Sequence, residues 1–239
     1  MPRAGTLLPA AAYVALAVAD SVAAGRPGGG ARRLRYVLKP ALMPVLASAF
    51  VRGTRGAEGQ SSALHAGTVA AQAFSWGGDV ALLGTGERSF LTGVGSFFGA
   101  HVAYMAAFLS VRGEPGDHDR AGLRVALGLW LTAGPVMTVA AGRRDPALRV
   151  PVAAYTTILS GMLASSHLLD HAMPAGVRRT LQAGTALFVV SDSVLAVQKF
   201  LLARPRPALE SVVMATYTAG QGLIAAGVAS AMRSVLDRR

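Results

Sequence analysis

Two aspartates lie inside stretches of the sequence that are otherwise apolar enough to cross a membrane. Asp79 follows the string AQAFSWGG, and Asp192 follows LFVVS. A carboxylate inside a membrane-spanning helix costs roughly 2.5–3.5 kcal/mol on insertion scales, so its presence indicates a function. Two such carboxylates can share acid–base chemistry, one donating a proton while the other stabilises positive charge or activates water. The alternative is a path for protons or ions.

Other polar side chains recur at helical spacings near these aspartates. Gln72 and Ser75 share a helical stripe with Asp79, and similar pairs occur in later apolar segments. Depth, counted at 1.5 Å per residue from the segment ends, places nearly all of them between the membrane midplane and the side opposite the termini. We therefore expect one pocket that opens to that side and is lined by the catalytic candidates Asp79 and Asp192 together with Lys39, His101, Tyr104, Tyr155, Tyr217 and Gln221. These six, with Ser191 and Lys199, are the substrate-binding candidates.

Simpler structural roles remain open for most of these candidates. Lys39 and Lys199 can extend to lipid headgroups, and His101 can be a hydrogen-bonded core histidine. Tyr155 can serve helix–helix packing alone. Asp20, on the first segment, lies near enough to the surface to be a helix-end charge. The two deeper aspartates are harder to explain without function.

Several kinds of chemistry are excluded by the motifs. The five histidines form no HxxxH or HExxH pattern on an expected span, and neither a G-x-S-x-G elbow nor a Walker loop occurs. The chain has no cysteine, which excludes disulfides and thiolate chemistry. We expect neither a metal site nor a cofactor.

The composition indicates the environment in which these side chains lie. Of 239 residues, 52% are hydrophobic and only 15% are charged, with a mean hydropathy of +0.44. Soluble domains carry about 25% charged residues, so the sequence predicts a polytopic membrane protein. The net charge of +11 comes from arginines placed singly or in pairs between apolar segments. Membrane lipids, and not nucleic acid, are the expected partners of these arginines.

Eight segments are long enough to span a bilayer, which takes about 20 largely apolar residues. The predicted fold is all-α: an eight-transmembrane-helix bundle forming a single transmembrane domain over residues 1–239, with both termini on one side. The breaks between segments are rich in Gly, Pro and charge. The segments are Ala4–Ala24, Leu34–Val51, Ala63–Leu83, Phe90–Val111, Gly122–Ala141, Ala147–Ser166, Arg178–Ala203 and Ala208–Met232.

The two halves of the chain show a weak similarity. Pro40 precedes Asp79 by 39 residues, and Pro151 precedes Asp192 by 41. The third and seventh segments run in the same direction in an eight-span bundle, so a parallel 4+4 repeat would account for the spacing. Chance is the alternative.

At these residues the chain resembles the lysoplasmalogenase (YhhN) family of multipass membrane proteins. The resemblance covers about Leu34 to Gly222, and the set of strings in order carries it. The chain between Arg112 and Arg149 matches less well. The strings are YVLKP at 36–40, FSWGGDVALL at 74–83, FLTGVGSFFGAHVAY at 90–104, PVAAY at 151–155 and LFVVSDS at 187–193, followed by Lys199-Phe200 and by Tyr217 with Gln221.

The resemblance implies hydrolysis of the vinyl ether bond of a lysoplasmalogen, a lysophospholipid, by a multi-pass protein of the cell membrane. The products would be a fatty aldehyde and a glycerophospho-alcohol. A vinyl ether is hydrolysed by protonation of its β-carbon, which suits two carboxylates. The other readings are a small transporter or proton-coupled permease that uses the same aspartates, and a lipid-binding protein without turnover. The oligomeric state is not indicated.

The residues also suggest roles for the two aspartates. Lys39 lies at a similar depth to Asp79 on the preceding segment, so the two can pair and Asp79 would be ionised. Asp192 lies about two turns deeper, and Lys199 on its own stripe is two turns away. We therefore expect Asp192 to be the general acid and Asp79 its ionised partner, with the reverse assignment open.

Overall fold

The structure is a computed structural model in which residues 4–57 and 62–236 are described. Eight long helices follow one another along the chain, and most of them pack against the next helix in the sequence. They are α1 (Ala4–Ala24), α2 (Gly29–Thr54), α3 (Ser62–Ala81), α4 (Glu87–Leu109), α5 (Arg120–Arg144), α6 (Arg149–Ser166), α7 (Ala175–Ala196) and α8 (Pro207–Leu236). The described residues contain no β-strand, only an isolated bridge between Arg112 and Leu169. The all-α prediction is confirmed.

Seven of these helices are long and apolar enough to cross a membrane, by length and composition. The exception in the described chain is α3, which carries His65, Gln72 and Asp79 among its 20 residues. Most of its polar side chains are buried inside the bundle, so the polar face of α3 is turned to the neighbouring helices. The chain is thus a multi-pass, all-helical protein.

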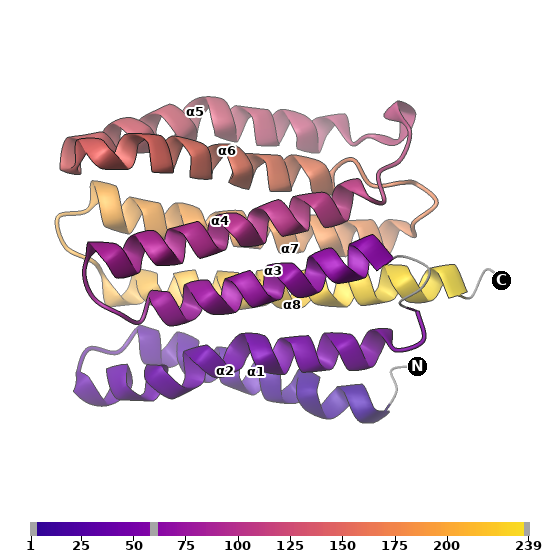
Figure 1. The fold of residues 1–239 in the computed structure, drawn as a ribbon, viewed down its shortest axis with the longest axis horizontal. Coiled ribbons are helices and arrows are strands. Elements are labelled where there is room, and N and C mark those ends of the chain that lie inside the picture. Colours follow the sequence, from indigo (N-terminus) through magenta and orange to yellow (C-terminus); the bar gives the residue numbers. More distant parts are fainter. Residues whose placement is uncertain (1–3, 58–61, 237–239) are drawn as a thin grey trace.

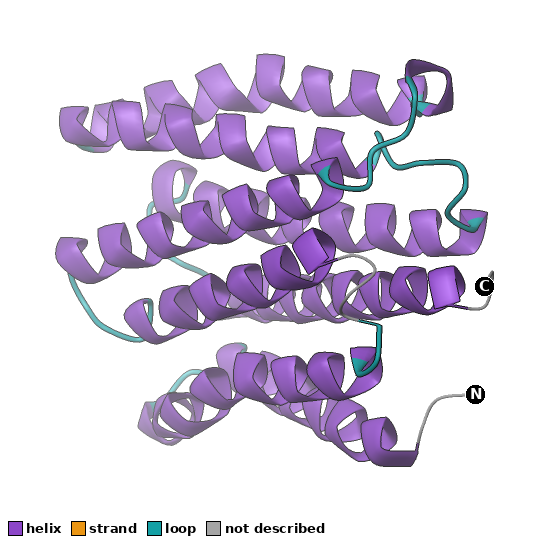
Figure 2. Ribbon diagram, turned by 45° about the vertical axis from the view of Figure 1, so that its right-hand side comes forward, coloured by secondary structure: helices purple, strands orange, loops and turns teal. Residues whose placement is uncertain are grey.

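The helices form antiparallel hairpins arranged side by side. The pair α1–α2 lies at one edge of the bundle and α5–α6 at the other, with α3, α4, α7 and α8 between them (Figure 1). The turned view in Figure 2 shows the same order. Both chain ends lie at the same end of the bundle, as expected for an even number of helices. The opposite end carries the connections α1–α2, α3–α4, α5–α6 and α7–α8.

Two prolines fix how α2 meets α3. Pro44 lacks the N–H that would hydrogen-bond the carbonyl of Pro40, one turn earlier. The indole Nε1 of Trp76 on α3 donates to that carbonyl oxygen at 3.0 Å. A backbone carbonyl freed inside a membrane helix needs such a partner. The contact joins α2 to α3 at Pro40, the residue that follows Lys39.

Close approach of helices depends on glycine at two crossings. A Cβ built on Gly78 of α3 would lie 2.5 Å from the Phe97 ring of α4. A Cβ on Gly220 of α8 would lie 2.8 Å from the carbonyl of Gly184 on α7. Small residues permit this packing where helices associate without a hydrophobic driving force between them.

The seventh predicted segment is divided into two parts. Helix α7 ends at Ala196, and a π-helical turn, η4 (Val197–Leu201), follows it. Single π turns widen a helix and occur frequently at functional sites. Arg144 of α5 donates from Nη2 to the carbonyl of Leu202 at 2.8 Å and from Nε to that of Phe200 at 3.4 Å. This arginine therefore supports the end of the π turn.

Candidate active site

Asp192 belongs to a hydrogen-bonded cluster with His101 and Tyr155, which come from three different helices. The Tyr155 hydroxyl on α6 donates to Asp192 Oδ2 on α7 at 2.7 Å. His101 Nε2, on α4, lies 3.0 Å from the same oxygen and 3.0 Å from the Tyr155 hydroxyl. Two donors thus hold one carboxylate oxygen, and no described residue hydrogen-bonds the other, Oδ1.

The imidazole of His101 is completely buried, and its Nδ1 has no hydrogen-bond partner within residues 4–57 and 62–236. A proton on Nδ1 would be a buried, unpaired donor, which is unfavourable. We therefore assign His101 as the neutral tautomer with its proton on Nε2, directed to Asp192.

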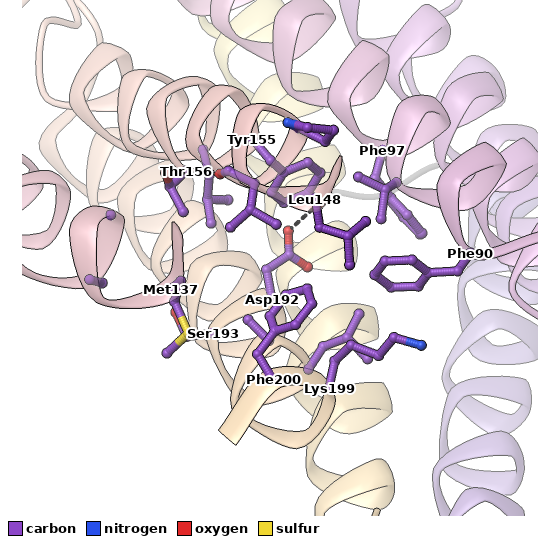
Figure 3. Close-up of a pocket in the computed structure, with 18 of the residues that line it drawn as sticks. Phe90, Phe97, Met137, Leu148, Tyr155, Thr156, Asp192, Ser193, Lys199 and Phe200 are labelled. Carbon is purple, nitrogen blue, oxygen red and sulfur yellow. Dashed lines mark hydrogen bonds between the residues drawn. The ribbon is translucent and has the colours of Figure 1, made fainter. Parts of the chain in front are cut away.

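A cavity of about 100 Å³ lies beside Asp192. Side chains of α4, α5, α6, α7 and η4 line it, and nearly all of them are apolar. Asp192, with its side chain 10% exposed, and Tyr155 supply polar groups inside the cavity (Figure 3). The exposed Lys199 lies at the η4 end, where its Nζ is 4.4 Å from the centre of the Phe90 ring.

Asp79 belongs to a second cluster, which is buried. Lys39 Nζ lies 3.6 Å from Asp79 Oδ1, and the Tyr217 hydroxyl donates to Oδ2 at 2.8 Å. The pairing of Lys39 with Asp79 that their depths predicted is confirmed. One helical turn along α8, Gln221 accepts a hydrogen bond from Tyr104 and donates to Ser75 Oγ at 2.8 Å.

Three packed aromatic rings, those of Phe97, Phe188 and Tyr217, lie between the two clusters. We call these rings the aromatic partition. The rings of Phe97 and Phe188 each pack edge-on against Tyr217, with centroids 5.7 and 5.3 Å away. On its other side Phe188 packs against His101, at 4.9 Å. Phe97 also lines the cavity. Asp192 therefore faces the cavity, whereas Asp79 is not among the residues that line it.

The expectation of a single pocket lined by eight of the candidates is thus wrong for this cavity, which only Tyr155 and Asp192 of those eight line. The aromatic partition separates the cavity from the Asp79 cluster, and the spacing of residues along single helices could not predict it. The cavity is lined by Tyr155, Asp192 and Lys199; the buried cluster contains Lys39, Tyr104, Asp79, Tyr217 and Gln221, and His101 stands between. Ser191 points elsewhere, since its hydroxyl donates to the carbonyl of Val213 on α8 at 3.1 Å.

Sequence reasoning missed a charged triad next to the second cluster. Asp20 is completely buried, so its interpretation as a helix-end charge is wrong. Arg35 Nε lies 3.2 Å from Asp20 Oδ1, and Arg35 Nη1 lies 3.3 Å from Glu210 Oε1. Arg35 is one turn before Lys39 on α2, and that i, i+4 spacing was the available signal.

Among residues 7–57 and 62–234, no group of three or more His, Asp or Glu side chains is arranged to hold a metal ion. The chemistry available in the described part of the chain is that of carboxyl, phenol, imidazole and ammonium groups. A carboxyl group with one oxygen fixed by two donors and the other free beside an apolar cavity can transfer a proton to a bound apolar molecule.

Comparison with known proteins identifies the family of this chain. The YhhN family model matches residues 34–228, which include every candidate residue. Human lysoplasmalogenase TMEM86B is 34% identical over 150 residues, or 63% of this chain. The matched part spans 57% of the length of that relative. No solved structure matches the chain. Because the family model covers most of the sequence, this chain belongs to the YhhN family.

Proposed function

We propose that the protein hydrolyses the vinyl ether bond of a lysoplasmalogen, a single-chain ether phospholipid of the membrane in which it lies. Family membership and the name of the human relative support the substrate class. The bundle of apolar helices supports a lipid substrate, and we place the protein in the cell membrane.

The observation that carries the proposal is the environment of Asp192. Its Oδ2 accepts hydrogen bonds from Tyr155 and His101, and Oδ1, beside the cavity, has no hydrogen-bond partner among the described residues. An apolar cavity suits an alkenyl chain, and the free carboxyl oxygen beside it is placed to deliver a proton to that chain.

The proposed reaction needs no group beyond these side chains and water. Asp192 donates the proton on Oδ1 to the β-carbon of the vinyl ether, which converts the double bond to a single bond and leaves an oxocarbenium ion. Water adds to the α-carbon and returns a proton to Asp192, giving a hemiacetal. The hemiacetal then breaks its C–O bond to the glycerol, releasing a fatty aldehyde and a glycerophospho-alcohol.

We assign Asp79 as the ionised partner that stabilises the positive charge from behind the aromatic partition. The Lys39 ammonium, 3.6 Å from Oδ1, and the Tyr217 hydroxyl, 2.8 Å from Oδ2, hold the carboxyl group in place for this role. In this role Asp79 does not touch the substrate, and its effect is electrostatic.

The test is aldehyde release from a 1-alkenyl-glycerophosphocholine by purified protein. Wild-type protein should release the aldehyde, and Asp192→Asn should reduce kcat by about a thousandfold or more, since it removes the proton donor. Asp117→Asn, which changes an aspartate in a connecting loop, is the matched control. Folded wild-type protein that releases no aldehyde would contradict the proposal. Proton-coupled flux in proteoliposomes without aldehyde would favour a transporter.

A further inference from the structure

The two lysines of the chain occupy unusual positions. Among 23 basic residues only Lys39 and Lys199 are lysine, and all others are arginine. Lys39 is buried and paired with Asp79 at 3.6 Å. Lys199 lines the cavity that contains Asp192, and no ion pair involves it in the described part of the chain. A cation at a cavity wall without an acidic partner is available to a ligand.

Lys199 and two aromatic side chains lie together at the η4 end of this cavity. The Lys199 Nζ lies 4.4 Å from the centre of the Phe90 ring, a cation–π contact between η4 and α4. Phe90 and Phe200 line the same end of the cavity, and Figure 3 shows Lys199 beside both. The π turn that carries Lys199 is supported by Arg144, which hydrogen-bonds the carbonyls of Phe200 and Leu202.

The distance from Lys199 to Asp192 suits one particular ligand chemistry. The two residues are seven positions apart on α7 and η4, which corresponds to about 10 Å along the helix axis. In a lysoplasmalogen, about seven bonds separate the β-carbon of the vinyl ether from the phosphorus. That is roughly 8 Å when extended, since an extended chain advances about 3.5 Å for every three bonds. A phosphate group would then lie near Nζ while the vinyl ether lies at Asp192.

We propose that Lys199 binds the phosphate of the single-chain ether lipid and thereby places its vinyl ether bond at Asp192. This inference rests on the proposed function and names the part of the substrate that sets its position. A lysine ammonium is a compact charge that binds phosphate well. Lys199 lies at the end of the bundle opposite the chain termini, the level at which lipid headgroups meet a membrane protein, and Asp192 lies two turns deeper.

Phe90 and Arg144 are positioning residues in this arrangement. Phe90 holds the ammonium at the cavity wall by a cation–π contact, which a phosphate can replace. Arg144 supports the π turn from the side of α5 through the carbonyls of Phe200 and Leu202, and its own side chain does not line the cavity.

The experiment compares ligands with and without phosphate. Binding of 1-alkyl-glycerophosphocholine and of 1-alkylglycerol, two ethers that lack the vinyl double bond, is measured on wild-type protein, Lys199→Gln and Lys199→Arg. We expect Lys199→Gln to weaken binding of the phosphate-containing ether about tenfold and to change binding of 1-alkylglycerol less than about twofold. Lys199→Arg should recover most of the lost binding, because the charge is retained.

Arg204→Gln is the matched control, since it removes an exposed cation from the same connection without touching the cavity. Equal weakening of both ligands by Lys199→Gln, or no weakening of either, would overturn the inference. Turnover is measured separately with the corresponding 1-alkenyl lipids, where Lys199→Gln should raise KM for the phosphate-containing substrate alone. Absence of aldehyde release would contradict the proposed function, while the binding results would still decide the role of Lys199.

Discussion

Asp192 has two neighbours that set its orientation: Tyr155, which lines the cavity with it, and the buried His101. Tyr155 and His101 both hold Oδ2, so the carboxyl group cannot rotate freely and Oδ1 remains directed away from them. Groups that orient a reacting side chain typically change rates by 10–100-fold when removed. At the residue scale, the activity therefore depends on how Asp192 is held as well as on its presence.

Tyr155→Phe should lower kcat for aldehyde release by about 10–100-fold with little change in KM, because it removes the shorter hydrogen bond to Oδ2. Steady-state kinetics on a vinyl ether substrate measures both constants. Tyr36→Phe, which alters a tyrosine that bonds the Leu83 carbonyl, should leave both near wild type. A variant with unchanged kcat and raised KM would instead assign Tyr155 to substrate binding.

Lys39 and Asp79 form a buried pair in which neither charge should be tolerated alone. Lys39→Met leaves the Asp79 carboxylate buried and unpaired, so we expect a loss of about 3–5 kcal/mol in the free energy of unfolding. The double variant Lys39→Met/Asp79→Asn should recover most of that loss while remaining poorly active. Denaturant unfolding in detergent measures the cycle, and additive losses in the double variant would show that the pair is not coupled.

At the scale of the elements, the α2–α3 contact places that buried pair. Because Pro44 has no N–H, the carbonyl of Pro40 is left free within α2, and the indole N–H of Trp76 donates to it. Lys39 precedes Pro40 on α2, and Asp79 follows Trp76 by one turn on α3. The helix contact and the ion pair therefore support each other.

Trp76→Phe should reduce the free energy of unfolding by about 1 kcal/mol beyond the packing loss of the smaller ring, since the Pro40 carbonyl loses its partner. In a Pro44→Ala background the helix can supply its own N–H to that carbonyl. The penalty for Trp76→Phe should then shrink, and unfolding of the four proteins gives the coupling. An identical penalty in both backgrounds would refute the account.

The sequence was sufficient to predict some parts of this arrangement and not others. Eight helical segments, the depth match of Lys39 with Asp79 and the family followed from local patterns and strings. The aromatic partition could not be predicted, because Phe97, Phe188 and Tyr217 meet from three helices whose relative rotation depends on packing. The π turn η4 was missed because an extra residue in a helical turn leaves no periodicity signal. The 4+4 repeat stays a prediction.

At the scale of the whole molecule, the end of the bundle near the termini is closed by paired loops. The connection after α4 meets the one after α6 through the bridge between Arg112 and Leu169. Asp119 caps α5 by accepting from the amides of Ala121 and Gly122, and its Oδ2 lies 2.9 Å from His167 Nδ1. The Gly122 amide, followed by His167, holds the pKa of the Asp119 carboxyl below its usual range.

A lowered pKa in the folded protein means that Asp119 stabilises the fold when ionised. Its contribution is fully present above the ordinary aspartate pKa of about 3.9 and is lost as the pH falls through the lowered value. Asp119→Ala should reduce the free energy of unfolding at pH 7 by about 1 kcal/mol through the lost cap, and Asp119→Asn by less. Thermal unfolding against pH should show both differences narrowing in strong acid. Differences that grow as the pH falls would contradict this account.

The polarity of α3 determines how the chain can enter a bilayer during synthesis. The helix is synthesised before α4, and its Gln72 and Asp79 make insertion of α3 alone into the bilayer unfavourable. We expect α3 to remain in the insertion machinery until α4 has been synthesised. The two helices then enter the bilayer together as a hairpin in which α4 covers the polar stripe of α3. A chain truncated after Gly84 and followed by a glycosylation reporter should therefore insert α3 poorly, whereas truncation after Ser110 should insert both helices. Efficient insertion of α3 alone would contradict this order of assembly.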